Sequence, residues 1–139
     1  MRRFLIILFC ICILLLNKPL VSASFSNESI VMPRYNYIQT LTTTIILDED
    51  TGIATVKAYG VVGAGYTIDV ECNLQQYIAA RWTTIKSWTT SGSRYGSIIK
   101  QHMLYSGYSY RVYATYRVRD ASGNLVETET DSYTCVYPS

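Results

Sequence analysis

The sequence has little of the chemistry from which most catalytic and metal sites are built. Among 139 residues there are one histidine, four cysteines and three prolines, and only 16% of the residues are charged. Cys10 and Cys12 lie in a hydrophobic run near the N-terminus, so the remainder has only Cys72, Cys135 and His102, far apart in sequence. Zinc sites need cysteine and histidine at short spacing. We therefore expect no metal and no cofactor.

Basic charge is also too scarce to predict a nucleic-acid-binding protein. The formal net charge is +2, but Arg2, Arg3 and Lys18 belong to the N-terminal segment; without them there are nine basic and ten acidic residues, a net charge of −1. Such a chain lacks the positive field with which proteins hold a phosphate backbone. We expect no nucleic acid among its partners.

The N-terminal segment has the three parts of a secretory signal peptide. Residues 1–3 are a short positive region, residues 4–16 are an apolar run, and Val21-Ser22-Ala23 has the small residues of a cleavage site. A spanning helix needs about 20 apolar residues, and no later uncharged stretch is that long. We expect a signal peptide at 1–23, a flexible leader at 24–34, and a secreted, extracellular chain without a membrane span.

The rest of the chain has the composition of strands. All 13 tyrosines lie there, with many threonines, valines and isoleucines, and these residues suit a pleated, half-buried surface. Turn-forming residues recur about every 10 to 15 positions. The runs between them predict seven strands, at 38–47, 53–62, 66–77, 81–88, 95–104, 108–119 and 125–136.

Several of these runs alternate between an apolar and a polar face. In the third, Ile68, Val70 and Cys72 alternate with Asp69 and Glu71, and the second and sixth runs follow the same pattern. A sheet covered on one side packs against a second sheet. The count and spacing predict an antiparallel sandwich or barrel, in one domain at 35–139, and the one-sided faces favour the sandwich.

A short motif resembles the sixth-strand region of fibronectin type III domains. The stretch 103–114 reads MLYSGYSYRVYA, and it places Tyr110 six positions after Leu104. The resemblance implies an immunoglobulin-like or fibronectin-III-like sandwich. It also implies a tyrosine corner, in which the Tyr110 hydroxyl bonds to backbone a few residues upstream.

A second resemblance covers most of the chain after the signal. The segments LQQ at 74–76, WTTIKSW at 82–88 and SGYSYRV at 106–112 are similar to an uncharacterised family of small secreted proteins from Gram-positive bacteria. This resemblance implies export and a conserved framework of aromatic and aliphatic residues. It implies no activity.

Nucleophilic catalysis would need His102 as its base. This residue lies within a predicted strand, beside Lys100 and Leu104, and no Gly-x-Ser-x-Gly element occurs in the chain. We therefore interpret His102 as a packing or surface residue.

Paired carboxylates could serve glycoside hydrolysis. Such acids share a face on the third predicted strand and on the seventh, and arginines on the sixth are expected to pair with them across strands; the residues are Asp69, Glu71, Glu127, Glu129, Asp131, Arg111, Arg117 and Arg119. This pattern is typical of a solvated face, so we expect no catalytic residues.

Cys72 and Cys135 allow two interpretations. Exported proteins commonly form disulfides, and closing this loop would stabilise the fold by roughly 3–4 kcal/mol. If the third and seventh strands both flank the sixth, however, the two residues lie roughly 10 Å apart, too far for a bond. A disulfide and a buried free thiol at Cys72 both stay open.

Four aromatic residues are candidates for ligand binding. Tyr59 and Tyr113 fall on polar strand faces, and Trp82 and Trp88 share one face of their predicted strand. Such rings could stack on sugars or pack on a protein. The sequence thus predicts a secreted, non-catalytic binding module for an unknown protein or glycan ligand, at or near the bacterial cell surface. A carbohydrate-binding module is the first alternative, and a small secreted hydrolase is the second.

Overall fold

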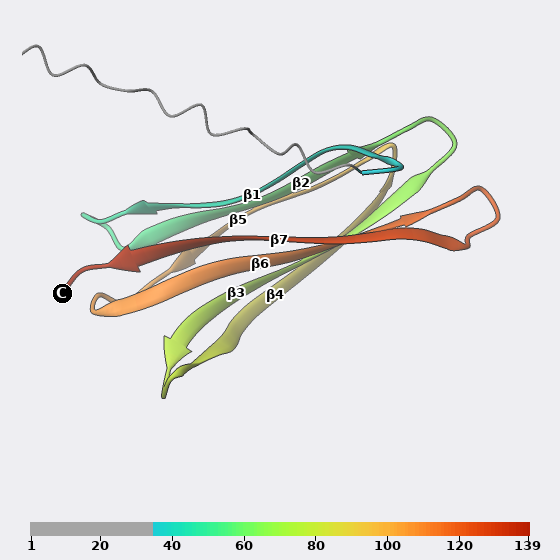
Figure 1. The fold of residues 1–139 in the computed structure, drawn as a ribbon. Helices are drawn as coiled ribbons and strands as arrows, with labels where there is room; N and C mark the ends of the chain where they lie inside the picture. Colours follow the sequence, from blue (N-terminus) through green and yellow to red (C-terminus); the bar gives the residue numbers. More distant parts are fainter. Residues whose placement is uncertain (1–34) are drawn as a thin grey trace, which may run out of the picture. The chain divides into compact units, whose positions relative to one another are not determined.

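Two antiparallel sheets form the part of the chain that the computed structural model describes, residues 35–139 (Figure 1). One sheet has the strand order β1-β2-β5, and the other has the order β4-β3-β6-β7. The strands are β1 (Ile38–Asp48), β2 (Ile53–Val62), β3 (Thr67–Ile78), β4 (Arg81–Ser93), β5 (Tyr95–Met103), β6 (Tyr108–Arg119) and β7 (Leu125–Tyr137). The expected all-β, seven-stranded sandwich is confirmed, whereas the expected signal peptide and leader lie outside the described residues.

The strand boundaries differ from the predicted ones by at most one residue, except at the end of β4. The predicted end of the fourth strand at residue 88 is wrong, because β4 continues to Ser93 and only Arg94, at φ 73°, separates it from β5. Gly92 permits this tight crossing between the sheets, since a Cβ there would collide with the carbonyl oxygen of Tyr95. Within residues 35–139 there is no helix of the length and apolarity needed to span a bilayer.

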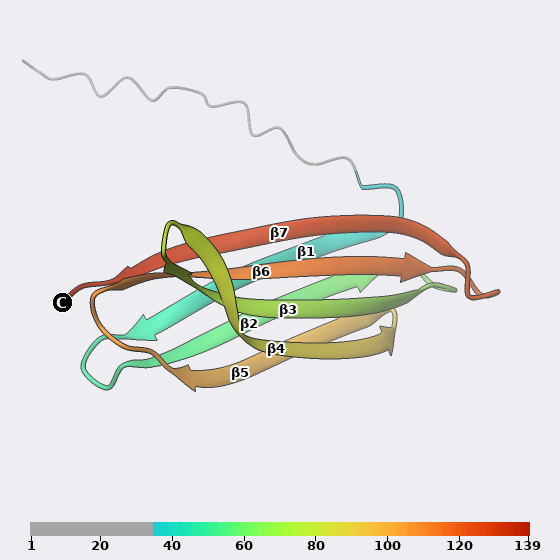
Figure 2. The same ribbon diagram turned by 90° about the horizontal axis from the view of Figure 1, so that it is seen from below.

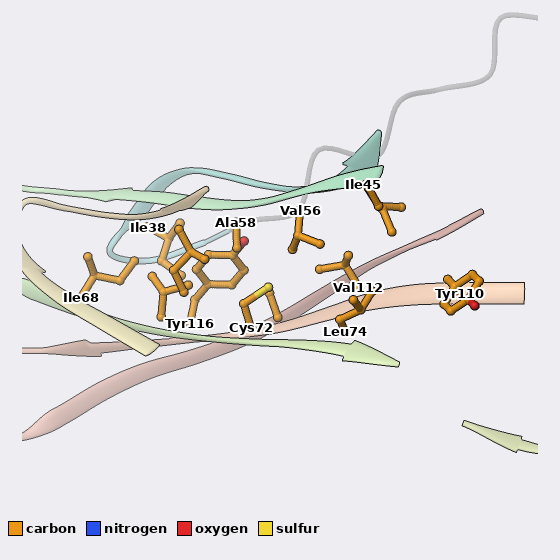
Figure 3. Close-up of a cluster of buried hydrophobic side chains, with 14 of the residues drawn as sticks. Ile38, Ile45, Val56, Ala58, Ile68, Cys72, Leu74, Tyr110, Val112 and Tyr116 are labelled. Carbon is orange, nitrogen blue, oxygen red and sulfur yellow. The ribbon is translucent and has the colours of Figure 1, made fainter. Parts of the chain in front are cut away.

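The core lies between the inward faces of the two sheets. Figure 3 shows Tyr116 and Cys72 pointing from the four-stranded sheet toward Val56 and Ala58 of the other sheet. The Tyr116 hydroxyl donates to the carbonyl oxygen of Thr42 at 2.9 Å. Burial raises the pKa of this hydroxyl to about 12. This buried hydroxyl therefore has the hydrogen-bond partner that its burial requires.

A tyrosine corner joins β6 to the loop before it. The hydroxyl of Tyr110 donates to the carbonyl oxygen of Tyr105 at 2.9 Å and accepts from the Tyr105 N–H at 3.0 Å. Tyr110 and the neighbouring Leu104 are both buried. This is the hydrogen bond that the resemblance of residues 103–114 to fibronectin type III domains implies.

The two cysteines are free thiols, and the disulfide interpretation is wrong. Cys72 lies opposite Ala114 of β6, and Cys135 lies opposite Tyr110 on the other side of that strand. They are two strand spacings apart, about 10 Å, and are offset by about 13 Å along β6. Cys72 is buried, and burial raises the pKa of its thiol to about 11.

Candidate functional site

Aromatic and amide side chains converge on Arg111, on the face of the four-stranded sheet that points away from the core. The Cζ atom of Arg111 lies 4.5 Å from the ring centroid of Trp82 and 5.4 Å from that of Tyr113. Tyr77 packs edge-on against Trp82, with ring centroids 5.2 Å apart. Two nitrogens of Arg111, Nε and Nη2, donate to the amide oxygen of Gln75 at 2.9 and 2.6 Å. We call these five residues the Arg111 cluster.

Strand register explains why these residues meet. Gln75 of β3 lies opposite Arg111 of β6, and Tyr77 of β3 lies opposite Trp82 of β4. Directly opposed residues of antiparallel strands share a face. Tyr113 is two positions from Arg111 on the same strand, so it lies on that face too.

A β-bulge in β4 determines the position of Trp82. Leu74 pairs with Lys86, but the next residue, Gln75, pairs with Thr84, so Ile85 is an extra residue in β4. Figure 2 shows β4 bending strongly toward its hairpin with β3. One extra residue reverses the facing of every side chain beyond it.

The bulge places the two tryptophans on opposite faces, and the expectation that they share one is wrong. Trp88 lies opposite Cys72, so it faces inward and packs against the core. It also lines a groove of about 350 Å³ between β4 and β5, with residues that include Ile98 and Lys100. Trp82, beyond the bulge, faces outward onto Arg111.

Tyr59 is also separate from the Arg111 cluster. It lies opposite Thr42 and Ser97 on the outer face of the three-stranded sheet and is 39% exposed. Of the four predicted ligand-binding aromatics, the structure therefore brings together Trp82 and Tyr113 and separates Trp88 and Tyr59 from them.

The acids of β3 form the expected cross-strand pairs with arginines of β6. Arg117 Nη1 lies 3.1 Å from Glu71 Oε2, and Arg119 Nε lies 3.0 Å from Asp69 Oδ2. Hydrogen bonds lower the pKa of both carboxyls: the first contributor is Asn73 for Glu71 and Ser91 for Asp69. Both carboxylates are engaged in these polar pairs.

The acids of β7 do not face the arginines, and that expectation is wrong. Glu127 lies opposite Val118, and Glu129 lies opposite Tyr116, both of which are core residues of β6. The carboxylates of β7 therefore lie on the inner face of this edge strand, whereas the arginines point outward. Their charge contributes, after burial, to raising the pKa of the Tyr35 hydroxyl.

Glu127 has a structural role that the sequence pattern does not predict. This residue is 9% exposed, and its carboxylate accepts three backbone hydrogen bonds, from Asn36 at 2.8 Å, Tyr37 at 2.9 Å and Ile38 at 3.0 Å. It thereby joins the start of β1 to β7.

His102 lies in β5 opposite Ala54 and is partly buried. Within residues 35–139, no group of three or more His, Cys, Asp or Glu side chains could hold a metal ion. The described residues thus offer no metal centre with which His102 could act.

Three members of the Arg111 cluster were not among the predicted ligand-binding residues: Arg111, Gln75 and Tyr77. The sequence contains a signal for the first two. The polar face of β3 carries Asp69 and Glu71 and then changes to the neutral Asn73 and Gln75, so the arginine opposite Gln75 has no acidic partner there.

Comparisons with known proteins add no family to this description. No protein-family model matches the chain, and no curated protein matches it. What the Arg111 cluster can bind follows from its own chemistry.

Proposed function

We propose that the protein is a secreted, non-catalytic binding module and that the Arg111 cluster is the centre of its binding surface. The observation that carries this proposal is the convergence of Trp82 and Tyr113 on one arginine. Tryptophan, tyrosine and arginine are the residue types that contribute most to binding energy at interfaces. Their rings supply a large contact area at low cost in conformational entropy.

The carboxylates of β3 support a role without catalysis. A glycosidase needs one carboxyl that holds a proton and a second that acts as base or nucleophile. Asp69 and Glu71 instead have lowered pKa values and are paired with arginines. Neither is suited to act as a general acid at neutral pH.

Carbohydrate recognition is the second candidate, and the surroundings of the Arg111 cluster favour it. Hydroxyl and amide side chains occupy the neighbouring register positions on this face: Asn73, Thr84, Ser87, Ser132 and Thr134. These groups both donate and accept hydrogen bonds. A sugar offers hydroxyls to such groups and an apolar ring face to an aromatic side chain.

Secretion, location and fold family belong to the same proposal. The signal-like segment at 1–23 and the resemblance to secreted Gram-positive proteins support a role at or near the bacterial cell surface. The corner at Tyr110 and the crossing of β5 to pair with β2 support an immunoglobulin-like or fibronectin-III-like sandwich.

The test is binding of the exported protein to a glycan array and to a surface extract, with three variants. Trp82→Ala and Tyr113→Ala should each weaken retention by about tenfold or more, as loss of a hot-spot residue does. Tyr59→Ala is the matched control, because it removes a similar exposed ring from the opposite sheet. Loss of binding in Tyr59→Ala alone, or hydrolysis of a bound glycan that requires His102, would contradict the proposal.

A further inference from the structure

Three arginines of β6 lie on the outer face, and one of them differs from the other two. Arg117 and Arg119 are each paired with a carboxylate of β3. Arg111 instead donates to the neutral amide oxygen of Gln75. Those two pairs are the ion pairs of residues 35–139, so the described part of the chain leaves the charge of Arg111 without an acidic partner.

Part of the Arg111 guanidinium is free to bind a ligand. Its Nε and Nη2 atoms donate to Gln75, whereas Nη1 has no hydrogen-bond acceptor among the described residues. In the same residues, no buried side-chain nitrogen or oxygen lacks a partner. The Nη1 atom is therefore reached by solvent, and the Nη1–Nη2 edge can donate two parallel hydrogen bonds to one carboxylate.

The guanidinium is also held in place before any ligand arrives. It lies against the rings of Trp82 and Tyr113, and Gln75 is itself fixed by a hydrogen bond from Nε2 to Thr84 Oγ1 at 3.1 Å. Preorganised side chains lose less conformational entropy on binding. A fixed, stacked arginine recognises a planar anion better than a flexible lysine would.

We propose that the ligand is an acidic polysaccharide and that Arg111 binds the carboxylate of one of its uronic acid units. The inference rests on the proposed binding role of this face. An acidic protein would supply the same carboxylate, but the positions next to the aromatic rings of the cluster carry hydroxyl and amide side chains. These groups match the hydroxyls of a sugar, while the rings match its apolar face.

The test uses immobilised polygalacturonate, alginate and hyaluronate, each beside its methyl-esterified form. Methyl esterification removes the charge and keeps the sugar. The exported protein should bind at least one of the three acids about tenfold more tightly than the ester, and added salt should weaken this binding because it screens the charges. Equal binding to acid and ester, or binding to none of the three acids, would overturn the inference.

Gln75→Glu is the decisive variant. It places a carboxylate directly opposite Arg111, much as Glu71 supplies a carboxylate to Arg117 from the neighbouring strand, and so neutralises the guanidinium while keeping the ring contacts. Binding to the acidic glycan should fall by about tenfold, with an unchanged circular dichroism spectrum. Arg117→Gln is the matched control, because it changes the net charge by the same amount but removes an arginine that is already paired; its binding should be unchanged.

The outcomes separate this inference from the proposed function. If Gln75→Glu binds like the wild type while Trp82→Ala loses binding, the face is a binding surface and its ligand is not anionic. If the protein binds polyglutamate or dextran sulfate but none of the uronic acid polymers, the inference that its ligand contains uronic acid units is wrong. If neither variant changes binding, the Arg111 cluster is not the binding surface and both proposals are wrong.

Discussion

Replacement of Glu127 tests how the first strand is held to the sandwich. Its carboxylate accepts the backbone N–H groups of Asn36, Tyr37 and Ile38 at 2.8 to 3.0 Å. Glu127→Ala removes all three acceptor interactions at once. Glu127→Gln keeps one acceptor oxygen but turns an NH2 group toward backbone donors.

The size of the effect follows from the burial of the three donors. A hydrogen bond to a charged group contributes about 1.5–3 kcal/mol to stability. The bond from Ile38 is buried, whereas those from Asn36 and Tyr37 are partly buried. In the variant, water can therefore accept hydrogen bonds from the N–H groups of Asn36 and Tyr37 in place of the carboxylate. We expect Glu127→Ala to lower the free energy of unfolding by about 3–5 kcal/mol, and Glu127→Gln by about half as much.

Thermal unfolding followed by circular dichroism measures this loss. About 1 kcal/mol shifts Tm by 4–8 °C in a domain of this size, so Glu127→Ala should melt at least 10 °C below the wild type. Glu129→Gln is the control, because it removes a neighbouring charge from the same face of β7. Hydrogen exchange should show lost protection at amides 36–38. A Glu127→Ala variant that melts with the wild type and keeps these amides protected would refute the anchoring role.

Three further predictions concern the core. Tyr110→Phe should cost about 1 kcal/mol for the corner bond, and more if the Tyr105 carbonyl is left unpaired; denaturant curves that superimpose on the wild type would contradict it. Gly60→Ala should lower the free energy of unfolding by about 1–3 kcal/mol, because its Cβ would lie 2.6 Å from Ile68 Cδ1. An unchanged denaturation midpoint would contradict this, because it would show that Ile68 moves aside without loss of stability. Burial raises the pKa of Cys72 to about 11, so the folded state favours the protonated thiol. Its contribution to stability is complete below the unfolded pKa of about 8.5 and is lost as pH rises toward 11. Urea unfolding between pH 8 and 11 measures this contribution. The free energy of unfolding of the wild type should fall more over this range than that of Cys72→Ala, which lacks the thiol.

Local pattern was sufficient to predict the architecture of the sandwich. Each strand follows the period of two that its pleat imposes, and residues such as Ile68, Val70 and Cys72 are buried as their alternation indicates. The corner at Tyr110 was expected from the resemblance to fibronectin type III domains, and the motif that carries this resemblance lies within one loop and strand. Turn residues marked most strand ends. Gly92 is an exception, because it lies inside β4, where it allows the close approach to the backbone of Tyr95.

The facing of the β7 acids was not predictable from the same pattern. A charged residue in a strand normally points to water, and Glu127 alternates with Thr128 as a solvated residue would. Its burial depends on a distant segment, because the N–H groups that it accepts lie about 90 residues earlier in the chain. The contact of Glu127 with these N–H groups therefore cannot be predicted from the residues next to Glu127.

The bulge at Ile85 shows why a binding surface is harder to predict than a core. Trp82 and Trp88 are six residues apart, an even spacing that puts both on one face of a regular strand. The extra residue leaves Trp88 against the core and moves Trp82 to the outer face. The β4 sequence alone does not contain this information, because a bulge is defined by the register with β3. Arg111 depends on the same register, since it meets Trp82 only where the bulged part of β4 pairs with β3, so the proposed binding surface is a product of sheet pairing and not of any single segment.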